Sequence, residues 1–221
     1  MRGLAVFIVS LVPGLLWLWF FARQDRRREP LSALLLAFFA GMIAVAPAAL
    51  VEFPFRELIA TPPNLFVRFL LAFLVIGAAE EGAKLLAVYF AVFRSREFDE
   101  VVDGIIYAVA ASLGFAAVEN LLYAAAFGIG TAPARAVVTT LAHASFGGVA
   151  GLYLGIAKLY PGRGLLAALP GFAAAAGLHG LYDFLIMAKL VHPAAAVALV
   201  YVTYRFVSGR IREVGGKAGA P

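Results

Sequence analysis

The chain has 221 residues, of which 63% are hydrophobic and only 14% are charged, with a formal net charge of +5. A soluble domain is about 45–50% apolar, so this composition excludes an ordinary water-soluble globule and indicates that lipid covers most of the apolar surface. The absence of cysteine excludes disulfides, thiolate metal ligands and a cysteine nucleophile.

Apolar segments bounded by charged residues, proline or glycine predict an all-α polytopic membrane bundle of about seven transmembrane helices. In chain order, the expected spans are Leu4–Phe21, Leu31–Val51, Leu65–Phe93, Val101–Phe127, Arg135–Leu159, Leu165–Met187 and Pro193–Val207. We expect residues 1–207 to form a single transmembrane domain and residues 208–221 to form a short cytoplasmic tail.

The distribution of Lys and Arg predicts the orientation in the cell membrane. The charges around the first span mostly follow it, which is the reverse of a signal peptide, so we expect a retained anchor. With the N-terminus outside, twelve of the eighteen Lys and Arg residues fall on the cytoplasmic side and five outside, while Lys84 lies within a span. This asymmetry favours an outside N-terminus and a cytoplasmic C-terminus. Basic residues at the ends of spans indicate anchoring to the lipid bilayer, and no nucleic-acid motif is present.

The third span carries Glu80, Glu81 and Lys84 in apolar surroundings. Each charge at mid-bilayer costs about 2.5–3.5 kcal/mol, so these groups must satisfy one another or other polar groups. Glu80 and Lys84 are four residues apart and predict an intrahelical ion pair. Glu81 points about 100° away from Glu80, so the ion pair does not account for it.

The fourth span carries Asp103 near its inner end and Glu119 and Asn120 towards its outer end. Asp103 is better explained as a helix-start residue that interacts with the helix dipole than as a catalytic group. Asn120 can donate a hydrogen bond to a substrate, but we favour a structural hydrogen bond to another helix.

The fifth span carries His143 and three glycines at four-residue intervals, Gly147, Gly151 and Gly155. Small residues at this spacing let another helix approach closely, and we interpret the glycines as a packing surface. The histidine has no such explanation and is a candidate for the functional site.

The sixth span carries His179 and Asp183 on one helix face, where the aspartate can fix the tautomer of the imidazole. The acids and imidazoles of the third to sixth spans fall at a similar depth, in the outer half of the bilayer. This common depth predicts one shared polar cavity that is open to the outside.

Two carboxylates and two imidazoles in one pocket suit activation of water. Two histidines and a glutamate also form a known ligand set for catalytic zinc, although the chain has no HExxH motif. From the residues alone, an enzyme and a proton- or ion-coupled transporter are about equally supported. A non-catalytic membrane scaffold that binds a partner helix through the glycines is a third alternative.

The ordered motifs resemble those of the PrsW family of intramembrane proteases, which is related to the CAAX prenyl endopeptidases and the bacteriocin-processing membrane proteases. The matching segments are Glu80-Glu81-Gly-Ala-Lys84 (EExxK), the segment Phe98–Tyr107, Gly114-Phe115-Ala-Ala-Val-Glu119-Asn120, His143, and His179-Gly-Leu-Tyr-Asp183. The resemblance covers about residues 75 to 187.

This resemblance implies an endopeptidase that makes a site-1-type cut in a membrane-anchored protein on the extracytoplasmic side. The implied partner is a single-span substrate of the anti-sigma-factor type. The implied catalytic residues are Glu80, Glu81, Glu119, His143 and His179, supported by Lys84, Asn120 and Asp183.

Among these residues, Glu81 is our first choice as the general base, while Glu80 either pairs with Lys84 or shares that role. The resemblance leaves metal use open. If a metal such as Zn²⁺ is bound, the expected ligands are His143, His179 and Glu119.

Overall fold

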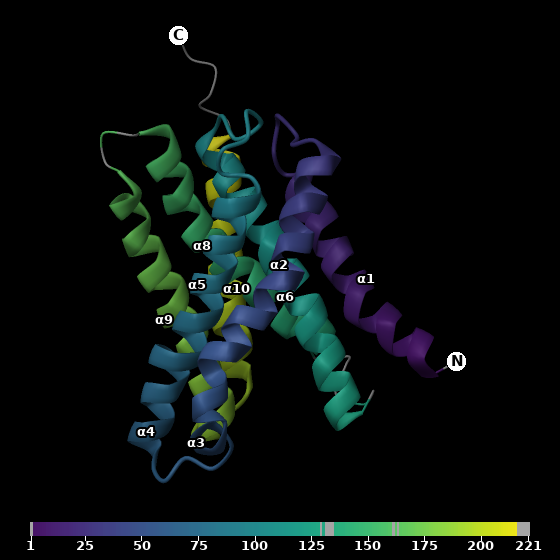
Figure 1. Ribbon diagram of the computed structural model, residues 1–221, viewed down its shortest axis with the longest axis vertical. Coiled ribbons are helices and arrows are strands. Elements are labelled where there is room, and N and C mark those ends of the chain that lie inside the picture. The colour runs from purple at the N-terminus through teal and green to yellow at the C-terminus, as the bar shows by residue number, and fades with distance from the viewer. Residues whose placement is uncertain (1, 129, 131–134, 161, 163, 216–221) are drawn as a thin grey trace.

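The computed structural model describes residues 2–128, 130, 135–160, 162 and 164–215. Long helices run roughly side by side, and many of their connecting loops lie near the two ends of the molecule (Figure 1). The helices are α1 (Arg2–Ala22), α2 (Leu31–Glu52), η1 (Phe53–Phe55), α3 (Arg56–Ala60), α4 (Leu65–Leu70), η2 (Leu71–Gly77), α5 (Ala78–Ala91), α6 (Val101–Phe127), η4 (Arg135–Thr139), α8 (Thr140–Leu159), η6 (Leu165–Ala168), α9 (Leu169–Ala188) and α10 (Ala194–Val214). This architecture confirms the predicted all-α class.

The helices follow the expected spans closely. Five described helical stretches are long and apolar enough to cross a membrane, and α1 contributes a shorter apolar helix. The third expected span corresponds to α4, η2 and α5, which follow one another without a gap and include the π-helical segment η2. The last helix continues to Val214, beyond the expected end of the span at Val207.

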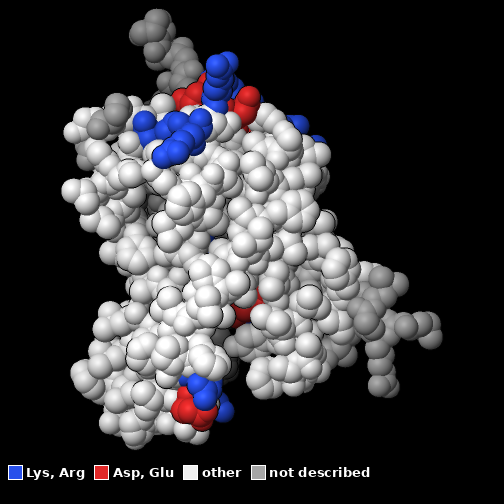
Figure 2. All heavy atoms as spheres, in the orientation of Figure 1, with Lys and Arg blue, Asp and Glu red and all other residues white. Residues whose placement is uncertain are grey.

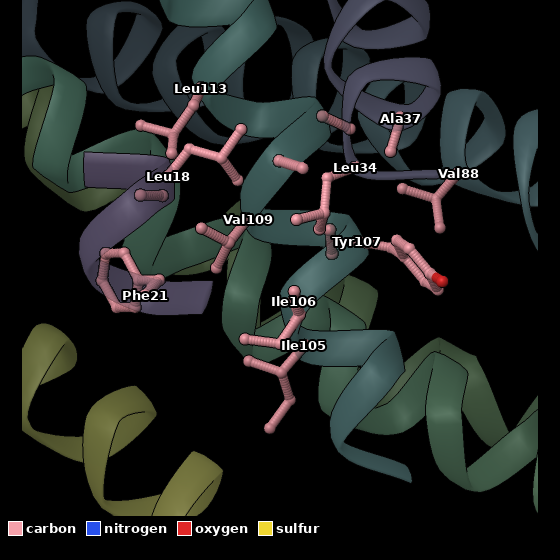
Figure 3. Close-up of a cluster of buried hydrophobic side chains, with 14 of the residues drawn as sticks. Leu18, Phe21, Leu34, Ala37, Val88, Ile105, Ile106, Tyr107, Val109 and Leu113 are labelled. Atoms are coloured by element: carbon pink, nitrogen blue, oxygen red, sulfur yellow. The ribbon is translucent and has the colours of Figure 1, made fainter. Parts of the chain in front are cut away.

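Helix α6 occupies the centre of the bundle. In an apolar stretch of 18 residues within this helix, 89% of the residues are buried. Its side chains Ile105, Val109 and Leu113 belong to the main core, together with residues from α1, α2 and α5 (Figure 3). On the outside, large apolar side chains such as Ile43 and Phe90 are exposed, as is expected where helices face lipid.

Helices α6 and α8 pack closely through the glycines of α8. A Cβ atom on Gly151 would lie 2.2 Å from the carbonyl oxygen of Gly104, and one on Gly155 would lie 2.3 Å from that of Val101. The predicted packing role is therefore confirmed. The scaffold alternative loses its binding surface, because α6 of the same chain already covers these glycines.

On the face shown in Figure 2, charged side chains gather at the two ends, and the surface between them is almost free of charge. One acidic group is visible within a recess midway along this face, which shows that the apolar band encloses polar side chains. The N-terminus of α6 lies at the more heavily charged end. There, Glu100 and Asp103 form a reciprocal capping box, as expected for a helix-start aspartate.

Candidate active site

Three charged residues on α5 form the floor of the candidate site. The ammonium group of Lys84 lies 2.8 Å from Glu81 Oε1, 3.3 Å from Glu80 Oε2 and 2.8 Å from His143 Nδ1. Lysine has three N–H donors, so these contacts use all of them. The expected Glu80–Lys84 pair is present, and the same lysine also holds Glu81, which the spacing alone did not explain.

Helix α9 brings His179 against α5. Glycines make this approach possible, because a Cβ on Gly77 would lie 2.6 Å from the carbonyl oxygen of Ala176, and one on Gly180 would lie 2.6 Å from the Cα of Phe73. His179 Nδ1 consequently lies 2.8 Å from Glu81 Oε1. Because an ionised carboxylate only accepts hydrogen bonds, we assign the Nδ1 proton to His179.

The other nitrogen of His179 remains available for chemistry. Nε2 lies 3.7 Å from Glu80 Oε2 and 3.6 Å from Asp183 Oδ2, beyond hydrogen-bonding distance from both. Asp183 lies on the same helix face as predicted, but the fixed tautomer of His179 comes from Glu81 instead.

His143 is held differently, because both of its nitrogens already have partners. Nε2 lies 2.8 Å from Glu119 Oε2, and Nδ1 lies 2.8 Å from Lys84. We therefore assign a proton to Nε2, which faces Glu119, while Nδ1 accepts from the lysine. The two imidazole rings meet edge to face with their centroids 5.1 Å apart.

The sequence analysis missed Arg135, which it counted among the outer positive charges. Arg135 lies 2.9 Å from Glu119 through Nη2, donates from Nε to Asn120 at 3.1 Å, and stacks over the ring of Tyr123. Asn120 also donates to Thr140 Oγ1 at 2.9 Å, so its expected role between helices is present. The signal for Arg135 was its place at the start of one span, beside the outer end of the preceding span, which carries Glu119.

A cavity of about 420 Å³ connects these groups. Its polar and charged lining residues are Glu52, Glu80, Glu119, Tyr123, Arg135, Thr139, His143, His179, Tyr182 and Asp183. Glu81 is fully buried and lies behind this lining, whereas Glu80 contributes to the wall. The predicted convergence of acids and imidazoles from separate helices on one polar cavity is therefore present.

The cavity also contains a candidate metal-binding group. Ligand atoms of Glu80, His143 and His179 all lie within 4.8 Å of one another. One carboxylate and two imidazoles fit catalytic zinc in donor type. In this group Glu80 takes the place that the sequence analysis gave to Glu119. Because Lys84 already bonds Glu80 and His143, a bound metal would compete with it for these donors.

A helical membrane bundle with carboxylates and imidazoles around an internal cavity fits an intramembrane hydrolase as well as an ion-coupled transporter. The match to a family model defines the class further: residues 29–208 match the PrsW family of intramembrane metalloproteases. The chain belongs to this family and is a membrane-embedded, multi-pass peptidase.

Curated relatives agree with this assignment. Protease PrsW of Geobacillus kaustophilus is 36% identical over 183 residues, which cover 81% of this chain and 79% of the relative. Protease PrsW of Bacillus subtilis is 32% identical over 186 residues, covering 83% and 84% respectively. Protease PrsW of Clostridioides difficile is 30% identical over 224 residues, covering 90% and 86%. No solved structure matches the chain.

Proposed function

We propose that this peptidase cleaves a membrane-anchored, single-span protein on its extracytoplasmic side, in the manner of a site-1 cut in an anti-sigma factor. The observation that carries this proposal is the position of Glu80 and the free nitrogen of His179 on the wall of one cavity. The cavity also contacts Glu52, Ile59 and Met187, near the end of the bundle that the Lys and Arg distribution assigns to the outside.

In this proposal Glu80 is the general base, because it lines the cavity and Glu81 does not. Glu80 takes a proton from a water molecule, which then attacks the peptide carbonyl. His179 Nε2 faces the same space and can stabilise the developing oxyanion or pass a proton to the leaving amine. Lys84 and Glu81 are positioning residues, which hold Glu80 and the tautomer of His179 respectively.

Glu119 and Arg135 hold the second imidazole. Glu119 lies 2.8 Å from His143 Nε2, and Arg135 pairs with Glu119 through its other oxygen at 2.9 Å. If zinc is bound, Glu80, His143 and His179 would hold it, so that Glu80 would be a ligand instead of a free base, and the metal would supply Lewis-acid activation of water.

The proposal can be tested before the substrate is identified. New protein N-termini are mapped by mass spectrometry in membranes from cells that produce the wild-type chain, Glu80→Gln or the exposed control Glu57→Gln. We expect cuts at outer juxtamembrane positions of single-span proteins in the wild type and the control, and their loss in Glu80→Gln. Identical N-termini in all three, or Glu80-dependent cuts on the cytoplasmic side, would contradict the proposal.

A further inference from the structure

A second group of acids lies at the opposite end of the bundle from α3, whose Ile59 lines the cavity (Figure 1). It joins the loop between α1 and α2 to the start of α6 (Figure 1). Carboxylate oxygens of Asp25, Glu29 and Asp103 all lie within 4.8 Å of one another. Asp25 is 4% exposed and Asp103 is 1% exposed, whereas Glu29 is partly exposed, so protein surrounds two of the three acids.

Hydrogen bonds orient two of these carboxylates. Asp103 Oδ2 accepts from the backbone N–H groups of Asp99 at 2.8 Å and Glu100 at 2.6 Å. Glu29 accepts a short hydrogen bond from the hydroxyl of Tyr107. These contacts leave further carboxylate oxygens available as ligands, because each carboxylate has two oxygens and several lone pairs.

Asp25 provides the independent observation that points to a ligand. Its Oδ1 accepts a long hydrogen bond from the backbone of Arg27, at 3.3 Å. Its Oδ2 is buried and has no hydrogen-bond partner among the residues that the structure describes. A buried oxygen without a partner loses the full free energy of hydration, which is more for a charged group than for a neutral one.

No positive side chain within the described ranges forms an ion pair with these three acids. The nearby Arg27 instead pairs with Asp99 at 3.2 Å and with Glu100 at 2.5 Å. Three acids at this separation therefore require either shared protons or a cation.

We propose that Asp25, Glu29 and Asp103 form a binding site for a hard divalent cation of the magnesium or calcium type. Oxygen-only ligands select such ions over zinc, which favours the nitrogen-containing group in the cavity. The bound ion ties the α1–α2 loop to the N-terminus of α6, the helix that carries Glu119 at its other end. The site is independent of the proposed proteolytic mechanism.

The test uses the full chain in detergent, stripped with EDTA, with Ca²⁺ alone and Mn²⁺ alone as probes. Equilibrium binding and the thermal midpoint Tm are measured for the wild type, Asp25→Asn and Glu29→Gln. We expect one equivalent of ion to be lost in both variants. Saturating Ca²⁺ should raise the Tm of the wild type by about 5 °C and leave that of the variants unchanged.

Two controls locate the effect. Glu97→Gln removes an exposed charge from the neighbouring loop, and His179→Ala alters the cavity. Both variants must still bind the one equivalent of ion that Asp25→Asn loses. Asp25→Asn must keep its Tm in EDTA, since it removes an uncompensated charge. If Asp25→Asn binds both ions as the wild type does, or if the wild type binds neither, the acids share protons and the proposal is overturned.

Discussion

Lys84 is the residue on which the electrostatics of the cavity floor depend, because it contacts two buried carboxylates and one imidazole. Replacing it by methionine keeps much of the side-chain length but leaves Glu80 and Glu81 uncompensated. Breaking a buried pair in this way costs about 3–5 kcal/mol. We expect a clear fall in Tm for Lys84→Met, measured on the purified protein.

The matched comparison is an exposed pair. Arg210 and Glu213 lie 2.7 Å apart at the surface, where an ion pair contributes about 0–1 kcal/mol. Arg210→Met should therefore change the Tm little. Adding Glu81→Gln to Lys84→Met should restore part of the lost stability, and a double variant no more stable than Lys84→Met would show that the charges are not coupled.

Zinc binding provides a second prediction about Lys84. The ammonium group and a metal would bond the same atoms of Glu80 and His143, so they compete for them. We expect Lys84→Met to bind zinc at least about tenfold more tightly than the wild type, a difference of about 1.4 kcal/mol. Zinc titration of the apo-protein measures this, and His179→Ala should weaken binding. Weaker zinc binding by Lys84→Met would contradict the assigned ligand set.

At the scale of helices, close packing of α8 on α6 sets the position of His143 relative to Glu119. A Cβ on Gly151 would lie within 2.2 Å of backbone, which cannot move without separating the helices. Overpacking commonly costs about 1–3 kcal/mol, and a backbone clash belongs at the upper end. We expect Gly151→Val to lower the Tm and to reduce the folded yield.

Gly177 on α9 offers the matched control, because no atom lies within 4 Å of a Cβ placed there. Gly177→Ala should leave the Tm unchanged or raise it slightly, since alanine favours the helix. Equal stability of the two variants in a thermal melt would show that α6 and α8 do not pack as described.

The helices were more predictable from the sequence than the site. Apolar runs and their boundaries are local properties, so Val101–Phe127 and Arg135–Leu159 were predicted to the residue. Which carboxylate faces the cavity depends on helix rotation and on how α9 packs at Gly180, and neither can be read from spacing. Sequence reasoning therefore placed Glu80 and Glu81 in the site but chose Glu81 as the general base, whereas Glu80 is the one that lines the cavity.

At the scale of the whole molecule, the orientation in the membrane remains a prediction from the Lys and Arg distribution. The absence of cysteine makes it directly testable with single introduced cysteines. In intact cells, a membrane-impermeant maleimide should label Thr61→Cys, between α3 and α4, and should label Ser95→Cys, between α5 and α6, only after lysis. The reverse pattern would place the cavity mouth on the cytoplasmic side and exclude an extracytoplasmic cut.

The most direct measurement is the cleavage rate of a substrate found by N-terminal mapping, with wild type, Glu80→Gln, Glu81→Gln and Glu52→Gln in liposomes. Loss of a general base costs about 10²–10⁴ in rate. The account predicts a loss of that size for Glu80→Gln, a smaller one for Glu81→Gln, and near wild-type rates for Glu52→Gln. A Glu80→Gln variant that cleaves at the wild-type rate, while Glu81→Gln does not, would contradict it.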